Sequence, residues 1–261
     1  MKDNLHGMKA NVAIDGIRVT CTTFDHVLSE MGRAIEQRSI YNYICITNTE
    51  SMYHALRIAE HLTYINNSTF SLCDGIGSVI AGLAFGYKIP RLNGPILMLK
   101  ACDYGVSRNW RHFFYGGKEG VADLMAEKLT EKNPGLIVAG TYCPPFRQLT
   151  LEEEKKVIEL IQDSKADIVW VGLGLLKQEK WIASHLNKIR VPWMVGVGAA
   201  FDYHAGTVPW APQWMQAIGM EWLYRLFLQP RLRIKRYYWS FIFMFQSIYK
   251  GLKLRFFRSK P

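Results

Sequence analysis

The sequence predicts an α/β fold with a mostly parallel sheet, helices on both of its faces, and a basic helical appendage at the C-terminus. Short apolar runs rich in β-branched and aromatic residues alternate with segments of helical periodicity, which is typical of parallel sheets. The length of 261 residues fits one such domain, or a domain plus an appendage. The formal net charge of +10 belongs to the C-terminal part, where the composition changes.

The predicted strands are apolar runs that mostly end in Gly, Asn or Asp. They cover residues 43–47, 69–73, 112–115, 136–139, 168–172 and 193–197. The predicted helices cover residues 50–62, 76–86, 119–132, 150–163 and 178–189. Thr150 and Glu153 form a capping-box pattern at the start of the fourth helix. An early segment, residues 11–20, is centred on Asp15-Gly16 and predicts a β-hairpin.

The C-terminal segment is basic and aromatic. From Arg225 onward the chain has ten Lys and Arg and no Asp or Glu, which leaves residues 1–224 with 22 residues of each sign. Its longest uncharged apolar run, residues 237–249, is shorter than the ~20 residues that span a bilayer. We therefore expect an α/β domain over residues 1–220 and a membrane-associating appendage over residues 221–261 that binds an anionic membrane surface.

Two other interpretations of this appendage are open. A basic, aromatic surface can bind RNA or single-stranded DNA, but the sequence has no nucleic-acid module, so no nucleic-acid partner is expected. The second interpretation is an ordinary C-terminal helix packed on the domain. The nearly unbroken run of Phe, Ile, Met and Trp argues against full solvation of such a helix.

The cysteines and the N-terminal residues indicate the cellular compartment of the protein. No two cysteines have the CxxC spacing of a zinc or redox site, which favours reduced thiols in a cytosolic protein. These cysteines are Cys21, Cys45, Cys73, Cys102 and Cys143. The first residues, with Asp3 and His6, lack the apolar core of a signal peptide. We expect a peripheral protein at the cytoplasmic face of the cell membrane.

Polar residues at the strand ends are the first candidates for a site, because ligands bind beyond the carboxyl ends of parallel strands. Asp74 follows a predicted strand and precedes Gly75-Ile76-Gly77 and a helix. A carboxylate there could take a proton from an acceptor hydroxyl, and the helix N-terminus suits a phosphate. The alternative, that Asp74 only caps helix 76–86, is equally compatible with the spacing.

Three further motifs carry weaker signals. The turn at residues 116–120 lacks both the dinucleotide and the phosphate-loop spacing, so a tight turn is its simpler interpretation. Gln178 could bind a sugar or pyrophosphate, whereas Glu179 is expected simply to complement the helix dipole. Asp202 and His204 fall short of a metal-ligand set, so we expect a structural or substrate-shaping loop and no metal.

Taken together, these motifs resemble the WecG/TagA/CpsF glycosyltransferase family over about residues 47–237. The resemblance rests on Asp74-Gly75-x-Gly77, residues 113–120, residues 171–179, residues 196–202 and Ala205-Gly206. The most specific stretch is Ala211-Pro212-x-Trp214-Met215, Gly219-x-Glu221-Trp222-x-x-Arg225-Leu226, Pro230-x-x-Arg233 and Arg236-Tyr237.

The resemblance implies a Rossmann-like fold and metal-independent transfer with inversion at the anomeric carbon, without a cofactor. The implied donor is a UDP-sugar of the N-acetylmannosamine type, and the implied acceptor is a polyprenyl-diphosphate-linked saccharide. The general base falls on Asp74. Polar pocket positions fall on Thr47 and Gln178. We also expect Thr49, Gly75, Gly77 and Trp210 to bind substrate. Membrane or diphosphate contacts fall on Arg225, Arg231, Arg233 and Arg236.

The chain also departs from the family pattern. Trp210 stands where an arginine usually precedes Ala-Pro, and Leu175-Leu176 stand where Ser/Thr-Pro is usual. Ile96 replaces a frequent aspartate, and Thr49 stands near an expected asparagine. Losing the arginine removes a diphosphate contact, although an indole could stack on a base or sugar. These departures motivate one alternative, a non-catalytic subunit of a polysaccharide-assembly complex, and the donor sugar, linkage and any homo-oligomer stay open.

Overall fold

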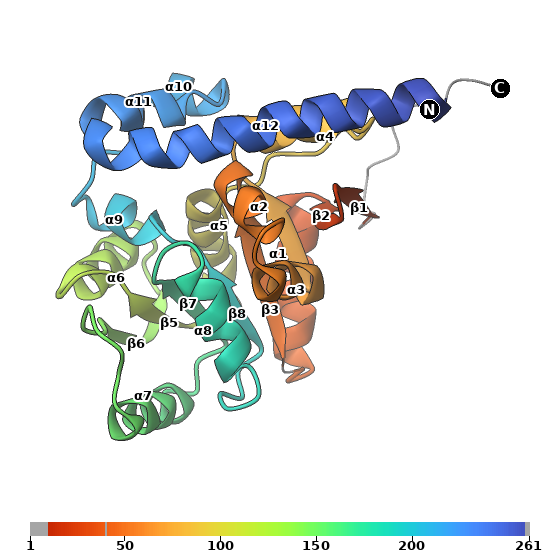
Figure 1. Cartoon of the computed structure of the whole chain (residues 1–261). Helices are drawn as coiled ribbons and strands as arrows, with labels where there is room; N and C mark the ends of the chain where they lie inside the picture. Colours follow the sequence, from red (N-terminus) through yellow and green to blue (C-terminus); the bar gives the residue numbers. More distant parts are fainter. Residues whose placement is uncertain (1–9, 40, 259–261) are drawn as a thin grey trace. The chain divides into compact units, whose positions relative to one another are not determined.

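The computed structural model describes residues 10–39 and 41–258 (Figure 1). Asp3, His6 and Lys260, which entered the expectations about the two ends of the chain, lie outside the described residues. Contacts divide the chain into two compact units. The first unit combines the chain up to Thr23 with Ile46–Asn93 and the chain from Trp210 onward, and the second combines Phe24–Cys45 with Gly94–Pro209. The expected domain boundary after residue 220 stays a prediction.

The predicted mostly parallel sheet is confirmed. Within the described residues its order is β4-β3-β8-β7-β5-β6. The strands are β3 (Asn42–Thr47), β4 (Phe70–Cys73), β5 (Arg111–Gly116), β6 (Ile137–Tyr142), β7 (Ile168–Gly172) and β8 (Trp193–Gly196). The pairs β3–β8, β8–β7, β7–β5 and β5–β6 are all parallel. The carboxyl ends of these strands therefore share one edge of the sheet.

Helices cover both faces of the sheet in the second unit. The helices are α1 (Phe24–Glu36), α5 (Gly94–Val106), α6 (Val121–Lys132), α7 (Leu151–Asp163), α8 (Lys177–His185) and α9 (Ala200–Ala205). Phe113 and Val169 pack with Val157 of α7 and Ile182 of α8 on one face. Because side chains alternate along a strand, Phe114 faces the other way, where its ring meets Phe201 of α9 edge-on. The capping box of Thr150 and Glu153 is confirmed at the start of α7.

The first unit contains the N-terminal hairpin and the C-terminal helices. Its remaining elements are β1 (Ala10–Ile14), β2 (Ile17–Cys21), α2 (Thr49–Ala55), α3 (Ala59–Asn67), α4 (Ile76–Ala84), α10 (Gln213–Ala217), α11 (Glu221–Leu228) and α12 (Pro230–Arg258). The strands β1 and β2 pair antiparallel around Asp15 and Gly16, both at positive φ, so the predicted hairpin is confirmed.

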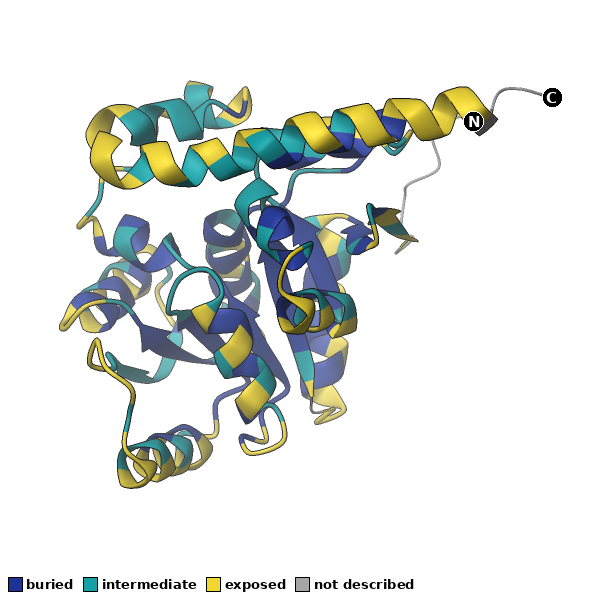
Figure 2. Cartoon of the chain, in the orientation of Figure 1, coloured by how far each residue is buried: buried dark blue, intermediate teal, exposed yellow. Residues whose placement is uncertain are grey.

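Only one side of helix α12 packs against the other elements of the first unit. Phe243 is completely buried in a core that includes Met52 of α2 and Ala81 of α4. A Cβ on Gly251 would lie 2.6 Å from the backbone carbonyl carbon of Ala84, so only glycine allows α12 to approach α4 this closely. The opposite side is exposed along most of the helix (Figure 2), with Phe245 66% exposed. The helix is thus part of the core and also presents an uncovered side.

Several element predictions need correction. The single helix predicted over residues 50–62 is two helices, α2 and α3, separated at residues 56–58. Sequence reasoning misses α1, although its buried residues recur at helical spacing, and α5, which is apolar on several sides and so has weak periodicity. The loop expected around residues 201–206 is the short helix α9, which ends at Gly206 in the left-handed conformation.

Among the described residues, no helix combines the length and apolar character needed to cross a membrane.

Candidate functional site

Asp74 lies at the carboxyl end of β4, beside the end of β3. Its backbone N–H donates to the Thr47 carbonyl oxygen at 3.0 Å, so the ends of the two strands are held together. The N-cap residue of α4 is Gly75, at φ 83, and not Asp74. The alternative interpretation of Asp74 as the cap of this helix is therefore wrong. Its side chain lies at the strand end where ligands bind parallel sheets.

Thr47, Thr49 and Gly77 surround this strand end. Thr47 is fully buried, and its hydroxyl oxygen lies 2.9 Å from that of Ser71 in β4. A Cβ on Gly77 would lie 2.7 Å from the Thr49 methyl carbon, so glycine lets the first turn of α4 approach the start of α2. Both helix N-termini are thus close to each other in the first unit. Substrate contacts by these residues stay predictions.

Arginines and acids from distant parts of the chain converge on Asp74. Burial raises the pKa of Asp74, while the Arg225 and Arg91 guanidiniums and the Gly75 backbone N–H oppose this rise. The Arg91 guanidinium donates to Glu221 at 2.8 Å, and the Trp210 indole N–H donates to the other Glu221 oxygen at 3.2 Å. Trp210 is therefore held by a carboxylate of α11.

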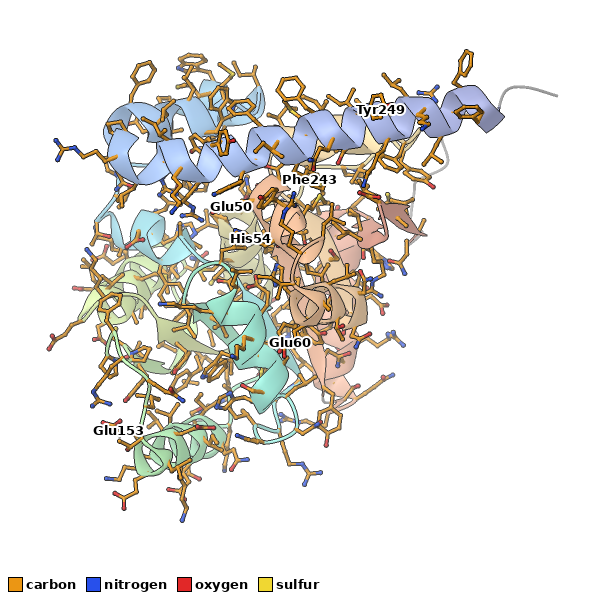
Figure 3. All side chains as sticks on the ribbon, viewed as in Figure 1. Glu50, His54, Glu60, Glu153, Phe243 and Tyr249 are labelled. Carbon is orange, nitrogen blue, oxygen red and sulfur yellow. The ribbon has the colours of Figure 1, made fainter. Side chains whose placement is uncertain are left out.

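Three of the four candidate arginines lie in one cluster. Burial lowers the pKa of Arg225, and the positive charges of Arg233 and Arg236 lower it further. Arg236 reaches α2, where it binds both carboxylate oxygens of Glu50. Figure 3 labels Glu50 at the end of α2 close to α12. Arg231, in contrast, is exposed on α12. The structure thus separates Arg231 from Arg233 and Arg236, which interact with Arg225.

Aromatic packing holds this cluster in place. The Trp222 ring of α11 meets Tyr237 and Phe241 of α12 edge-on, each at a centroid distance of 5.9 Å. Tyr53 of α2 stacks on Trp239 of α12 at 4.9 Å. These contacts connect α2, α11 and α12, which carry Glu50, Arg225 and the α12 arginines.

Gln178 belongs to the second unit, in the first turn of α8. Its amide oxygen accepts from the Gly198 backbone N–H at 3.0 Å, and its amide nitrogen donates to Glu179 at 3.0 Å. Glu179 is almost fully buried, and burial raises its pKa to about 7, although the Gln178 amide and the backbone N–H groups of Glu179 and Leu176 lower it. Sequence reasoning gave Glu179 a dipole role only, because spacing does not show burial.

The weaker candidates have structural roles. A Cβ on Gly116 would lie 2.6 Å from the Gly172 backbone, and Gly117 donates to the Gly172 carbonyl oxygen, so this turn lets β5 and β7 approach closely. The His204 ring nitrogen lies 3.0 Å from the Pro95 carbonyl oxygen, and burial lowers the pKa of His204 to about 4. In the part of the chain that the structure describes, no group of three or more His, Cys, Asp or Glu could hold a metal ion.

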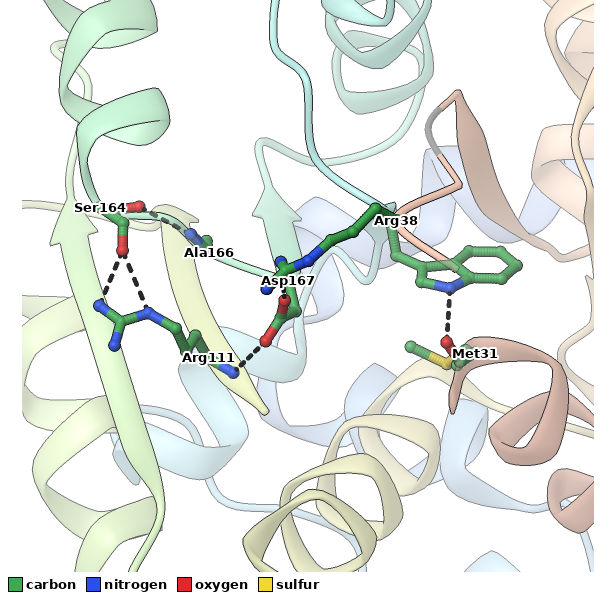
Figure 4. A network of polar contacts seen from close by, with 7 residues as sticks. Met31, Arg38, Arg111, Ser164, Ala166 and Asp167 are labelled. Atoms are coloured by element: carbon green, nitrogen blue, oxygen red, sulfur yellow. Dashed lines mark hydrogen bonds and ion pairs between the residues drawn. The ribbon is translucent and has the colours of Figure 1, made fainter. Parts of the chain in front are cut away.

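A separate polar network lies at the amino ends of β5 and β7 (Figure 4). The Asp167 carboxylate accepts from the Arg111 backbone N–H at 2.9 Å and from the Arg38 guanidinium at 3.1 Å. The Arg111 guanidinium in turn donates to the Ser164 carbonyl oxygen at 2.9 Å. Because ligands bind at the opposite ends of parallel strands, this network supports the fold and not the site.

A partly buried carboxylate and an arginine cluster thus lie at the carboxyl end of β4, the end of a strand at which α/β proteins bind ligands. Comparison with known families is more specific. The chain belongs to the glycosyl transferase WecG/TagA/CpsF family, whose profile matches residues 12–256. The protein is therefore a glycosyltransferase, and the sequence resemblance is confirmed.

Two relatives carry the same name, which states an activity. The chain is similar to the N-acetylglucosaminyldiphosphoundecaprenol N-acetyl-beta-D-mannosaminyltransferase of Bacillus subtilis (strain 168), with 28% identity over 72% of each chain. A protein of the same name from Staphylococcus aureus (strain MRSA252) is 27% identical over 91% of this chain and 92% of that protein. The similarity to the Staphylococcus aureus protein thus extends over about nine tenths of both chains.

Proposed function

We propose that this glycosyltransferase moves an N-acetylmannosamine-type sugar from a UDP-sugar to a polyprenyl-diphosphate-linked saccharide. The transfer inverts the anomeric carbon, uses no metal, and serves the synthesis of a surface polysaccharide or wall polymer. The names of the relatives support this sugar and a lipid-linked diphosphate acceptor. The observation that carries the proposal is the position of Asp74 at a strand end, among arginines from α11 and the loop after α4.

Asp74 acts as the general base in this reaction. Its ionised carboxylate takes the proton of an acceptor hydroxyl as the hydroxyl oxygen bonds to the anomeric carbon. The bond from that carbon to the diphosphate oxygen breaks on the opposite face, and its electron pair leaves with UDP. Burial raises the pKa of Asp74, which makes its carboxylate a stronger base than an exposed aspartate, while the charges of Arg225 and Arg91 favour the ionised form.

Arg225, Arg233 and Arg236 bind diphosphate in this proposal. Their mutual repulsion contributes to the lowered pKa of Arg225, so an anion bound among them would relieve that repulsion. Arginine suits this role because its planar guanidinium can donate two parallel hydrogen bonds to phosphate oxygens. The N-terminus of α4, opened by Gly75, adds backbone N–H groups at the same strand end.

The exposed side of α12 binds the anionic cytoplasmic face of the membrane. It carries large apolar side chains with exposed fractions between 42% and 69%. These are Ile234, Tyr238, Phe241, Phe245, Tyr249, Leu252 and Phe256. Exposed cations such as Arg231, Lys235 and Lys253 accompany them, and each contributes about 1 kcal/mol near an anionic surface. A peripheral position would bring the site to a lipid-linked acceptor.

The test is UDP release by the full chain with a panel of UDP-sugars and a polyprenyl-diphosphate-linked acceptor. Asp74→Asn should lower turnover by at least about a thousandfold while the folded structure is retained. Asp163→Asn, at an exposed position at the end of α7, is the matched control and should keep normal turnover. Normal turnover by Asp74→Asn would remove Asp74 as the base. Inactivity of the wild-type chain with every donor would favour the non-catalytic alternative.

A further inference from the structure

We propose that a cavity beside the last turns of α12 binds the phosphate headgroup of an anionic phospholipid, with Arg255 as the cation that recognises it. The inference deepens the proposed membrane contact of α12 and rests on it, because it assigns one lipid molecule a defined site in place of a general attraction to the surface. It concerns the first unit alone and none of the residues proposed to act in sugar transfer.

Three segments of the first unit line this headgroup cavity, which has a volume of about 350 Å³. They are the β1–β2 turn, the loop that follows α4 and the last turns of α12 (Figure 1). The described residues that line it include Asp15, Gly16, Phe85, Tyr87, Leu254 and Arg255. Small-molecule sites in proteins have volumes of about 300–1,000 Å³, so the cavity is large enough for a phosphate with its glycerol.

Contacts on two sides hold α12 against these segments. The Lys250 ammonium donates to the Asp15 carboxylate at 2.6 Å, which ties α12 to the β1–β2 turn. Gly251 allows α12 to approach the end of α4, because a Cβ there would lie 2.6 Å from the Ala84 carbonyl carbon. Arg255 follows Gly251 by one helical turn and therefore lies on the same side of α12. The helix thus directs Arg255 toward the loop after α4.

The Arg255 side chain lies over this loop. A Cβ on Gly86 would lie 3.9 Å from the Arg255 Cδ and 4.0 Å from its Nε. On either side of Gly86 in the chain, Phe85 and Tyr87 pack against the apolar core of the first unit. The cation therefore stands beside two aromatic residues that the core holds in position.

The end of α4 does not need Arg255 as a cap. The Gly86 backbone N–H donates to the Leu83 carbonyl oxygen at 3.0 Å, and that of Tyr87 donates to the Gly82 carbonyl oxygen at 2.9 Å. With Gly86 at φ 89, these two bonds form the Schellman motif that satisfies the last carbonyls of a helix. Within the described chain, no hydrogen bond or ion pair joins the Arg255 guanidinium to another residue, so none of them competes with an anionic ligand for it.

The charges around the headgroup cavity favour an anion. Asp15 lines the cavity, but Lys250 neutralises its carboxylate. Lys88, directly after Tyr87, and Lys253 of α12 add two exposed cations. The Arg255 guanidinium can donate two parallel hydrogen bonds to phosphate oxygens, which an ammonium group cannot do.

A second hollow beside Arg255 suits the apolar part of a lipid. It has a volume of about 680 Å³, and Arg255 lines it as well as the headgroup cavity. Tyr249, Leu252 and Phe256 of α12 also line it, with exposed fractions between 54% and 69%. A phospholipid, which joins a phosphate to apolar chains, would occupy both hollows and cover these side chains, whereas free phosphate would leave them in water.

The test is the binding of dihexanoyl phosphatidylglycerol, below its critical micelle concentration, to the full chain in solution. No membrane is present, so attraction to a charged surface does not contribute. Labelling with carbonyl-¹³C phenylalanine and ¹⁵N glycine isolates the NMR signal of Gly86, since Phe85-Gly86 is the only Phe-Gly pair in the sequence. This signal should shift to saturation, and dihexanoyl phosphatidylcholine should bind at least about tenfold more weakly, because its headgroup carries no net charge.

Three variants locate the site. Arg255→Gln should weaken binding at least about tenfold, because it removes charged hydrogen bonds to the phosphate. Ala13→Trp, at an exposed position that also lines the headgroup cavity, should weaken binding by filling the space without a change of charge. Arg190→Gln, at an exposed position in the second unit, removes an equal charge and should bind the lipid normally.

Three results would overturn the proposal. They are an unshifted Gly86 signal, wild-type affinity in Arg255→Gln, and binding of inorganic phosphate as tight as that of the lipid. If Arg255→Gln does not fold, Ala13→Trp decides alone, because unchanged binding by that variant contradicts the site. Failure of the proposed function is seen separately, as wild-type protein that does not sediment with anionic vesicles or does not release UDP.

Discussion

Phe243 and Phe245 of α12 offer a paired test of whether this helix belongs to the core. The two residues have the same chemistry and lie two positions apart, but Phe243 is 0% exposed and Phe245 is 66% exposed. Phe243→Ala removes a fully buried ring from a core shared with Met52, Ala81 and Ile89. Phe245→Ala removes a ring from the uncovered side of the same helix.

The expected costs differ by several kcal/mol. Burial of a phenylalanine side chain contributes about 1.5–3 kcal/mol by transfer from water, and the cavity left in a close-packed core adds to this loss. Phe243→Ala should therefore lower the free energy of unfolding by about 3–5 kcal/mol. Phe245→Ala should change it by less than about 0.5 kcal/mol, as is usual for exposed positions.

Two assays on the full chain separate these roles. Denaturant unfolding, followed by circular dichroism, should show the loss for Phe243→Ala and not for Phe245→Ala. Sedimentation with phosphatidylglycerol-containing vesicles should show weaker binding for Phe245→Ala, with phosphatidylcholine vesicles as the uncharged control. Equal stability of the two variants would refute the packing of α12 described above. Unchanged vesicle binding by Phe245→Ala would count against membrane contact through this side of the helix.

Two further outcomes concern the second unit. Asp167→Ala should lower the free energy of unfolding by about 1–3 kcal/mol in urea titrations, because it leaves the Arg111 backbone N–H without its acceptor. Arg38→Ala should lower it by less than about 1 kcal/mol, because the Arg38 side chain is 75% exposed. A larger loss for Arg38→Ala would contradict this ranking. Because the pKa of Glu179 is raised from 4.5 to about 7, its contribution to stability is present below pH 4.5 and is lost as the pH rises through 7. Glu179→Gln should reduce the decline of stability between pH 5 and pH 8, and an unchanged decline would mean that Glu179 is ionised in the folded protein at lower pH.

Features that depend on neighbouring residues were predictable from the sequence. The Asp15-Gly16 turn and the Thr150–Glu153 capping box were both correct, because each involves residues no more than three positions apart. The alternation of apolar runs with helical periodicity likewise predicted the parallel sheet. The break between α2 and α3 was missed because the apolar pattern continues across it.

The candidate site depends on contacts between distant residues, which sequence patterns do not show. Asp74 was recognised as a candidate from its position after a strand and before a glycine turn. Arg91 had no signal in the sequence, since it follows Pro90 in a loop and its partner Glu221 is 130 residues away. Glu179 was underrated for a similar reason, because its burial depends on how α8 packs and not on its neighbours in the chain.

The basic C-terminal segment shows most clearly which properties follow from the sequence and which from the tertiary structure. The sequence by itself determined that all of the net charge follows residue 224, and that the apolar run within this segment is short. Only the tertiary structure decided which side of α12 enters the core through Phe243, which arginines gather around Arg225, and that Arg231 stays exposed. The physical reason is that composition and periodicity are properties of the chain alone, whereas burial and charge pairing depend on surfaces supplied by residues more than a hundred positions away.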